Sequence, residues 1–282
     1  MSLEEHGRRM MRAVSALLLL LSVFGVPAQA QEASATAGGP RQATFVGQYK
    51  TILPHVVFGG GWHNRFMFVN YNSNTASVRL YFYGNDGSAL AVPIKQFGTY
   101  TEVDVYLQGW GTRVIETDES PGDALQQGWA KAVVSCGSTT CADVVIYGVF
   151  ATAEVPGYPV FEATVFAGDS RSTNALFPFD NRNGFSTGIA IVARCTAPDT
   201  RSVYVNLRYA DAASDLSQHT LTMPCQGHTS FSLPDFDSSS QNRLGFVEVA
   251  TSSSDLWVSA IALLFNPHGG AHTTIPASEY IP

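Results

Sequence analysis

The sequence predicts an all-β protein built from two tandem β-sandwich (Ig-like) domains that are related by internal duplication. Three observations predict this fold: many short runs rich in β-branched and aromatic residues, matching segments in the two halves, and no amphipathic helical stretch of three turns. Glycine, asparagine, proline and serine separate the runs, and Asn85-Asp86-Gly87 is a hairpin-turn signal. Short strands at this spacing are typical of sandwiches and barrels.

The duplication is predicted by segments that match in the same order along the chain. The clearest pairs are Ile52-Leu53-Pro54 with Leu176-Phe177-Pro178, Gly61-Trp62 with Gly184-Phe185, and Gly128-Trp129 with Gly245-Phe246. Two sandwich cores each require aromatic bulk, so we expect four matched aromatic residues to lie in the core: Trp62, Trp129, Phe185 and Phe246.

The first 30 residues have the pattern of a secretory signal peptide. A basic cluster (Arg8, Arg9, Arg12) precedes an apolar run over residues 13–26, and Ala28-Gln29-Ala30 supplies small residues for a peptidase. A spanning helix needs about 20 apolar residues, which is more than this run offers. We therefore expect cleavage after Ala30, a secreted protein that is periplasmic or extracellular, and no membrane span in the mature chain.

The remaining chain divides into a leader and two repeats. Residues 31–45, rich in alanine, glutamine and glycine, predict a flexible leader. Repeat 1 is predicted over residues 46–170 and repeat 2 over residues 171–282, because a polar stretch near Gly168–Thr173 separates the matched segments.

Four cysteines, an even number, indicate disulfides in a secreted chain. Three pairings are possible, and we favour Cys136–Cys141, which closes a tight loop, with Cys195–Cys225, which ties two strands of the second half. A zinc site is disfavoured because the first pair has Cys-x4-Cys spacing without a nearby histidine.

Charge and motifs disfavour several functional classes. The formal net charge is −7, and the chain after residue 30 has no cluster of lysine and arginine, which argues against nucleic acid and anionic membranes as partners. The chain contains no Gly-x-Ser-x-Gly elbow. Glu102, Asp104, Glu116 and Asp118 could supply a glycosidase carboxylate pair, but the strand matched to Glu102 and Asp104 in the second half, Thr229 to Leu233, lacks carboxylates. A solvated face is favoured, so we expect no enzyme.

Metal and anion sites are weakly signalled. Residues 180–184 and Asp235–Asp237 carry oxygen ligands that suit Ca²⁺, but neither has a full loop motif. His268 and His272 lie in a Pro-Gly-Gly turn, where a solvated turn is the favoured interpretation. Gly59-Gly60-Gly61 precedes an expected strand rather than a helix, so it is no phosphate loop. We therefore expect no metal and no cofactor, with calcium as the alternative.

One tryptophan and two tyrosines are the candidate ligand-binding residues. Trp110 stands between two glycines, where an exposed ring could stack on a sugar or anchor a protein interface, and Tyr106 and Tyr158 could assist it. The runs 144–150 and 256–265 are apolar on both faces, whereas a strand with one wet face alternates. We therefore expect another module or another chain to bury at least one of their outer faces.

A family resemblance is carried by four stretches: Pro54 to Asn70, Tyr81 to Leu90, Gln127 to Val134, and Phe177 to Ala193. They resemble uncharacterised tandem repeat modules in secreted proteins of environmental bacteria, notably acidobacteria. The resemblance implies a β-sandwich architecture and an extracellular location, and it implies no catalytic residues. The cysteines are not part of its pattern.

The leading hypothesis is a secreted, non-enzymatic structural or binding protein, such as a surface, adhesion or assembly subunit. The alternative is a carbohydrate-binding module pair that acts through exposed aromatic residues, and a polysaccharide hydrolase is less favoured. The expected partner is polysaccharide or protein, including a second copy of this chain in a homo-oligomer.

Overall fold

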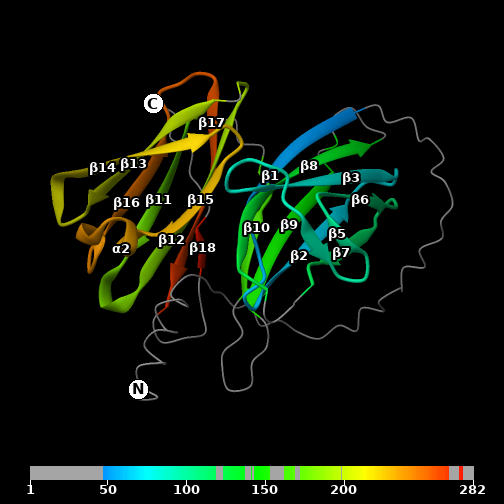
Figure 1. Ribbon diagram of the computed structural model, residues 1–282, viewed down its shortest axis with the longest axis horizontal. Helices are drawn as coiled ribbons and strands as arrows, with labels where there is room; N and C mark the ends of the chain where they lie inside the picture. The colour runs from blue at the N-terminus through cyan, green and yellow to red at the C-terminus, as the bar shows by residue number, and fades with distance from the viewer. Residues whose placement is uncertain are drawn as a thin grey trace, which may run out of the picture.

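The computed structural model describes residues 47–118, 123–136, 141, 143–152, 162–168, 172–197, 199–266 and 273–275. Within these ranges the regular structure is almost entirely antiparallel β-sheet, so the all-β prediction is confirmed. The expected signal peptide, the leader, Tyr158, His268 and His272 lie outside the described residues. Figure 1 shows the strands gathered in two groups that lie against each other, the N-terminal half in blue to green and the C-terminal half in green-yellow to red.

The N-terminal half contains two four-stranded sheets. Sheet 1 has the order β1-β8-β3-β6, and sheet 2 has the order β10-β9-β2-β7. The strands are β1 (Gly47–Phe58), β2 (Trp62–Asn70), β3 (Ala76–Gly84), β6 (Glu102–Leu107), β7 (Thr112–Glu116), β8 (Gln126–Cys136), β9 (Val144–Thr152) and β10 (Glu162–Phe166). A small hairpin, β4 (Val92–Ile94) with β5 (Gly98–Tyr100), is inserted before β6.

The C-terminal half repeats this strand order. Sheet 3 runs β11-β16-β13-β14 and sheet 4 runs β15-β12-β17-β18, so each strand has a counterpart at the same place in the first half. The elements are β11 (Asn174–Asp180), β12 (Ser186–Cys195), β13 (Thr200–Tyr209), β14 (Ala212–Pro224), β15 (His228–Ser232), β16 (Leu244–Ala250), β17 (Leu256–Phe265), β18 (Thr273–Ile275), the helix α2 (Leu233–Phe236), and the 3₁₀ turns η1 (Arg182–Gly184) and η2 (Ser238–Ser240).

The pairing differs from that of an immunoglobulin domain. In immunoglobulin sandwiches the first strand lies beside the second. Here β1 pairs with β8, and β11 pairs with β16. The description Ig-like therefore fits only the two-layer arrangement and not the strand order.

Two glycines show how closely the halves correspond. A Cβ on Gly128 would lie 2.0 Å from the carbonyl oxygen of Tyr83, and a Cβ on Gly245 would lie 2.0 Å from that of Arg208. Only glycine permits this close approach of two backbones. The residues that follow, Trp129 and Phe246, are therefore at equivalent positions.

Each half encloses its own hydrophobic core. Along β3 the inward residues alternate with outward ones, as a strand with one buried face requires. The N-terminal core takes inward residues such as Phe66, Phe68 and Leu80, and the C-terminal core takes others such as Phe177 and Ile191.

The four aromatic residues expected in the core differ in how deeply they are buried. Trp129 is fully buried, Trp62 and Phe185 are half-buried, and Phe246 is 39% exposed. The core prediction is wrong for Phe246, because neighbouring residues of a strand face opposite sides and Val247 takes the inward position. Trp129 faces outward too, yet it is buried in a separate cluster with Ile52 and Val192.

That separate cluster belongs to an interface between the halves. The outer face of sheet 4 packs on the N-terminal half, and its residues Ala190, Ile261, Leu263 and Phe265 join the N-terminal core cluster. The apolar run over residues 256–265 is therefore buried on both faces, as the sequence predicted.

Both disulfides join the predicted partners. Cys136 and Cys141 close a short loop after β8, and Cys195 at the end of β12 is bonded to Cys225 in the turn after β14. Disulfides fit an oxidising compartment. None of the helices in the described ranges has the length and apolar character needed to cross a bilayer.

Candidate binding sites

Trp110 is presented on a turn between β6 and β7 and is 72% exposed. Its backbone N–H donates to the carbonyl oxygen of Asn72 at 2.8 Å, which fixes the turn against the loop after β2. A Cβ on the preceding Gly109 would lie 2.0 Å from the carbonyl oxygen of Ser73, so only glycine allows the two turns to touch. The indole is therefore held on a rigid support.

Two exposed tyrosines accompany Trp110. Tyr106 on β6 is 49% exposed, and Tyr71, on the turn that carries Asn72, is 54% exposed. Tyr71 is fixed by its backbone N–H, which donates to the carbonyl oxygen of Asp143 at 2.8 Å. These three exposed residues, on β6 and on the two turns that touch, are called the aromatic platform below: Trp110, Tyr106 and Tyr71. Sequence reasoning missed Tyr71, although its place just after an apolar strand was the available signal.

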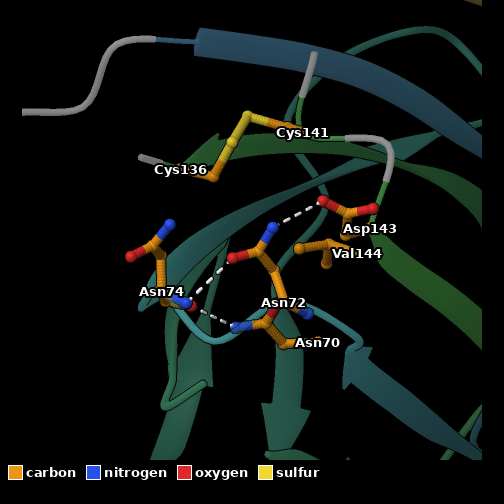
Figure 2. A pocket seen from close by; sticks show the side chains of 7 residues that line it. All are labelled: Asn70, Asn72, Asn74, Cys136, Cys141, Asp143 and Val144. Carbon is orange, nitrogen blue, oxygen red and sulfur yellow. Dashed lines mark hydrogen bonds between the residues drawn. A yellow bond between two sulfur atoms is a disulfide. The ribbon is translucent and has the colours of Figure 1, made fainter. Parts of the chain in front are cut away.

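The pocket in Figure 2 is lined by Asn70 and Asn72, the residues on either side of Tyr71 in the chain. Asn70 Nδ2 donates to the carbonyl oxygen of Asn74 at 2.8 Å, Asn74 N–H donates to Asn72 Oδ1 at 2.9 Å, and Asn72 Nδ2 donates to Asp143 Oδ2 at 2.8 Å. The disulfide Cys136–Cys141 closes the other side of the pocket. Since the amide groups are engaged with the loop itself, we assign this pocket a structural role.

A pair of buried histidines joins the two halves. His55 Nδ1 lies 3.1 Å from His228 Nε2, and His228 Nδ1 lies 2.7 Å from Asn85 Oδ1. Because an amide oxygen only accepts, His228 Nδ1 carries a proton and its Nε2 accepts from His55 Nδ1–H. The backbone carbonyl oxygen of Asn85 accepts from the backbone N–H of His228 at 3.0 Å.

Both imidazoles are neutral. Burial lowers the pKa of His55 to about 4. Burial, followed by the nearness of His55, holds the pKa of His228 well below its ordinary value. A protonated ring at this place would be desolvated without a carboxylate to compensate it, so the chain of hydrogen bonds suits neutral rings.

A crevice of about 650 Å³, including its open mouth, lies beside His55 between the halves. Its apolar wall includes Trp62 and Phe231. Its polar side chains are already paired: Ser230 Oγ donates to Gln127 Oε1 at 2.6 Å, and Ser232 Oγ donates to an Asp235 oxygen at 2.7 Å. We therefore treat the crevice as part of the interface.

Ser217, His219 and Asp237 form the cluster that comes nearest to a catalytic group. Ser217 Oγ and Asp237 Oδ2 both contact the same nitrogen of His219, Nε2, at 3.2 and 3.0 Å. A catalytic triad needs the serine on one ring nitrogen and the carboxylate on the other. Burial raises the pKa of Asp237, but hydrogen bonds from Ser217, Ser239 and His219 outweigh it and hold the pKa well below its ordinary value. The cluster is a carboxylate fixed by donors rather than a triad.

Three of the four carboxylates considered for sugar hydrolysis are paired with arginines: Glu102, Asp104 and Glu116. Arg79 binds Asp104 through two hydrogen bonds of 2.6 and 2.7 Å, and Arg65 binds Glu116 at 2.9 Å. The predicted match between Thr229 to Leu233 and the strand of Glu102 and Asp104 is wrong. β14 takes the place of β6, and β15, with Thr229 to Ser232, takes the place of β7.

The segments considered for calcium are also engaged internally. Asp180 accepts from Arg182 at 2.7 Å, and Asn181 is buried, with its Oδ1 accepting from Thr187 N–H at 2.8 Å. Among the residues that the structure describes, no three histidine, cysteine, aspartate or glutamate side chains gather as a metal site.

Comparison with known protein families, with curated proteins and with solved structures finds no match to this chain. The resemblance to secreted tandem repeat modules therefore stays a prediction.

Proposed function

We propose that this chain is a secreted, non-enzymatic structural or binding protein, a surface, adhesion or assembly subunit built from two duplicated β-sandwich modules. The strand order that recurs in sheets 1 and 3, and again in sheets 2 and 4, supports duplication. The equivalent close approaches at Gly128 and Gly245 support it at the level of single residues. We propose that the two modules correspond to the limits predicted from the sequence, residues 46–170 and 171–282.

The observation that carries a structural role is the interface at which the two halves pack against each other. Trp129 Nε1 donates to the carbonyl oxygen of Gln226 at 2.7 Å, which adds a polar contact to the apolar cluster around it. Thr274 Oγ1 donates to the carbonyl oxygen of Thr164 at 2.9 Å at the far end of the same interface. Modules linked only by a flexible segment would lack such contacts, so this geometry suits a structural subunit of a larger assembly.

Secretion is supported by two independent features. The N-terminal 30 residues have the signal-peptide pattern. All four cysteines are paired in disulfides, which persist in oxidising compartments.

The proposal is tested by fractionating cells that produce the full chain and detecting the protein in each fraction. We expect a processed form in the surface fraction or the medium with both disulfides formed. A variant with Ala28→Leu and Ala30→Leu, which removes the small residues read by the peptidase, should accumulate unprocessed. A full-length, reduced protein in the cytoplasm would contradict the proposal.

A second candidate, carbohydrate binding, is favoured by the aromatic platform. Flat, exposed rings on a rigid support stack on sugar faces at a low cost in conformational entropy. In native gels that contain a polysaccharide, we expect retardation of the wild-type protein on at least one polymer. Trp110→Ala should weaken binding at least tenfold, which is about 1.4 kcal/mol.

The matched control for this test is Phe97→Ala. Phe97 is 57% exposed at the tip of the β4–β5 hairpin, outside the platform. Equal retardation of the wild type and Trp110→Ala on every polymer that binds would eliminate the platform as the carbohydrate site.

A further inference from the structure

The outer face of sheet 2 carries an uncovered apolar row that crosses all four strands. Phe166 on β10 pairs with Tyr147 on β9, Tyr147 pairs with Met67 on β2, and Met67 pairs with Val114 on β7. Phe166 and Val114 are 55% and 45% exposed, and the rings of Phe166 and Tyr147 meet edge to face at 5.7 Å. A continuous apolar row on a flat sheet face is typical of an interaction site.

The same face of the C-terminal half is covered. Sheet 4 has the strand order of sheet 2, and the inward residues Ile189 and Ile191 of β12 take the places of Phe66 and Phe68 of β2. The outward pair Ala190–Ile261 then takes the place of the pair Met67–Tyr147. Ala190 and Ile261 are each only 4% exposed, because the N-terminal half lies on them.

The surface that covers sheet 4 also has an uncovered counterpart. In the N-terminal half it lies on β1 and β8 and includes Ile52 and Trp129. By strand order and register its counterpart lies on β11 and β16, where Leu176 and Phe246 occupy the positions of Ile52 and Trp129. Phe246 is 39% exposed, and Arg208 beside it is exposed as well.

We propose that copies of this chain assemble head to tail, with the β11–β16 surface of one copy docked on the outer face of sheet 2 of the next. This contact repeats between chains the contact that joins the two halves within one chain. The inference rests on the proposed structural function and names its partner, a second copy of the chain. A heterologous contact of this kind leaves one free surface at each end, so it extends into a filament unless its rotation closes a ring.

Charges at the rims suit this docking. Arg65, beside the apolar row, is flanked by Glu116 at 2.9 Å and Glu162 at 3.6 Å. Phe246 has Arg208 opposite it on the neighbouring strand β13, and Glu248 lies two residues further along β16. Mixed charges on both sides around an apolar centre correspond to the usual composition of an interface, with an apolar core and a polar rim.

The experiment measures the mass of the purified mature protein by light scattering over a range of concentrations, with electron microscopy of the same samples. Wild-type protein should grow in mass with concentration and form filaments or rings. Phe166→Asp and Phe246→Asp should each remain monomeric, because a charge is placed in one or the other docking surface. Phe97→Asp is the matched control, an equally exposed phenylalanine outside both surfaces, and should assemble like the wild type.

Mixing the two interface variants gives the sharpest test. Phe166→Asp keeps an intact β11–β16 surface and Phe246→Asp keeps an intact sheet 2 face, so an equimolar mixture should form a capped dimer and nothing larger. The circular dichroism spectra and melting temperatures of all variants should match those of the wild type, which shows that they are folded.

Three results would overturn the inference. The first is a wild-type protein that stays monomeric at all concentrations. The second is assembly that is abolished by Phe166→Asp but not by Phe246→Asp, which indicates a symmetric pairing of sheet 2 faces. The third is a mixture of the two variants that stays monomeric although the wild type assembles. A monomer still found processed in the surface fraction would refute the assembly and leave the proposed structural function standing.

Discussion

Trp129 and Phe246 stand at equivalent places in the two halves and have opposite environments. Each follows a glycine that lies against a neighbouring strand, and each points outward from its sheet. Trp129 is fully buried and stacks on Tyr83 with ring centroids 4.4 Å apart, whereas Phe246 is 39% exposed. The strand and its register are the same, so the difference comes from what lies against the sheet.

The lesson is that duplication repeats a strand but need not repeat its contacts. Two copies in one chain make one interface. The equivalents of its two surfaces, the outer face of sheet 2 and the β11–β16 surface, are therefore left without a partner in that interface. The outer face of sheet 4 uses small or polar residues such as Gly188, Ala190 and Ser230, which permit close packing of the N-terminal half. The outer face of sheet 2 has Arg65, Met67 and Val114 at the corresponding places.

The largest expected effect comes from truncating the two aromatic residues in turn. Trp129→Ala should lower the free energy of unfolding by about 3–5 kcal/mol, because it leaves a cavity and an unpaired carbonyl oxygen at Gln226. Phe246→Ala in monomeric protein should cost less than about 1 kcal/mol, since an exposed ring loses little buried area. Urea unfolding of both variants measures the difference, and equal losses would remove the distinction between the two positions.

A second expected effect is a loss of folding stability at acidic pH. An unfolded histidine takes up a proton near its ordinary pKa, about 6.5, whereas folded His55 does so only near 4. The free energy of unfolding is therefore unaffected by His55 protonation above about pH 6.5, and it decreases as the pH falls from there toward 4. The loss is on the order of 3 kcal/mol for His55, since each unit of pKa corresponds to about 1.4 kcal/mol.

The onset of this loss is measured by urea unfolding between pH 7 and about pH 5.5, above the range in which ordinary carboxyl groups titrate. His55→Gln should flatten the dependence, and adding His228→Gln should flatten it further. If the free energy of unfolding of the double variant fell with pH as steeply as that of the wild type, the histidine pair would not be the cause of the acid sensitivity.

The smallest expected effect concerns Gly87, in the turn after β3, whose backbone lies close to the C-terminal half. Gly87 and Gly61 both have φ above +80°, so alanine at either place carries a conformational cost of about 1 kcal/mol. A Cβ on Gly87 would lie 2.7 Å from the carbonyl oxygen of Cys225 in the C-terminal half, but a Cβ on Gly61 meets nothing within 4 Å. Gly87→Ala should therefore cost about 1–3 kcal/mol more than Gly61→Ala in thermal unfolding.

Much of the local structure could be read from the residues. The Asn85-Asp86-Gly87 signal marks the turn after β3, and the pairs Gly128-Trp129 and Gly245-Phe246 lie in β8 and β16, the strands that they were expected to open. The strand match between Glu102 and residues 229–233 failed because the second half lacks the β4–β5 hairpin, so counting short runs shifted the alignment by one strand.

The aromatic platform was predictable in part. Trp110 is exposed, as its flanking glycines indicated, and Tyr106, predicted to assist it, is exposed as well. Tyr71 joins them through the contact of two turns that are far apart in the sequence, a contact that depends on the missing side chain of Gly109.

The sequence by itself determined the strand class and the order of matching segments, because alternation and turn chemistry are local properties, and it favoured one of three possible disulfide pairings. Only the tertiary structure decided which outward faces are buried, which aromatic ring lies between the halves and which histidines meet. The physical reason is that Trp129 and Phe246, or Met67 and Ala190, sit in equivalent strands with equivalent registers. Their burial depends on a neighbouring surface that strand periodicity does not specify.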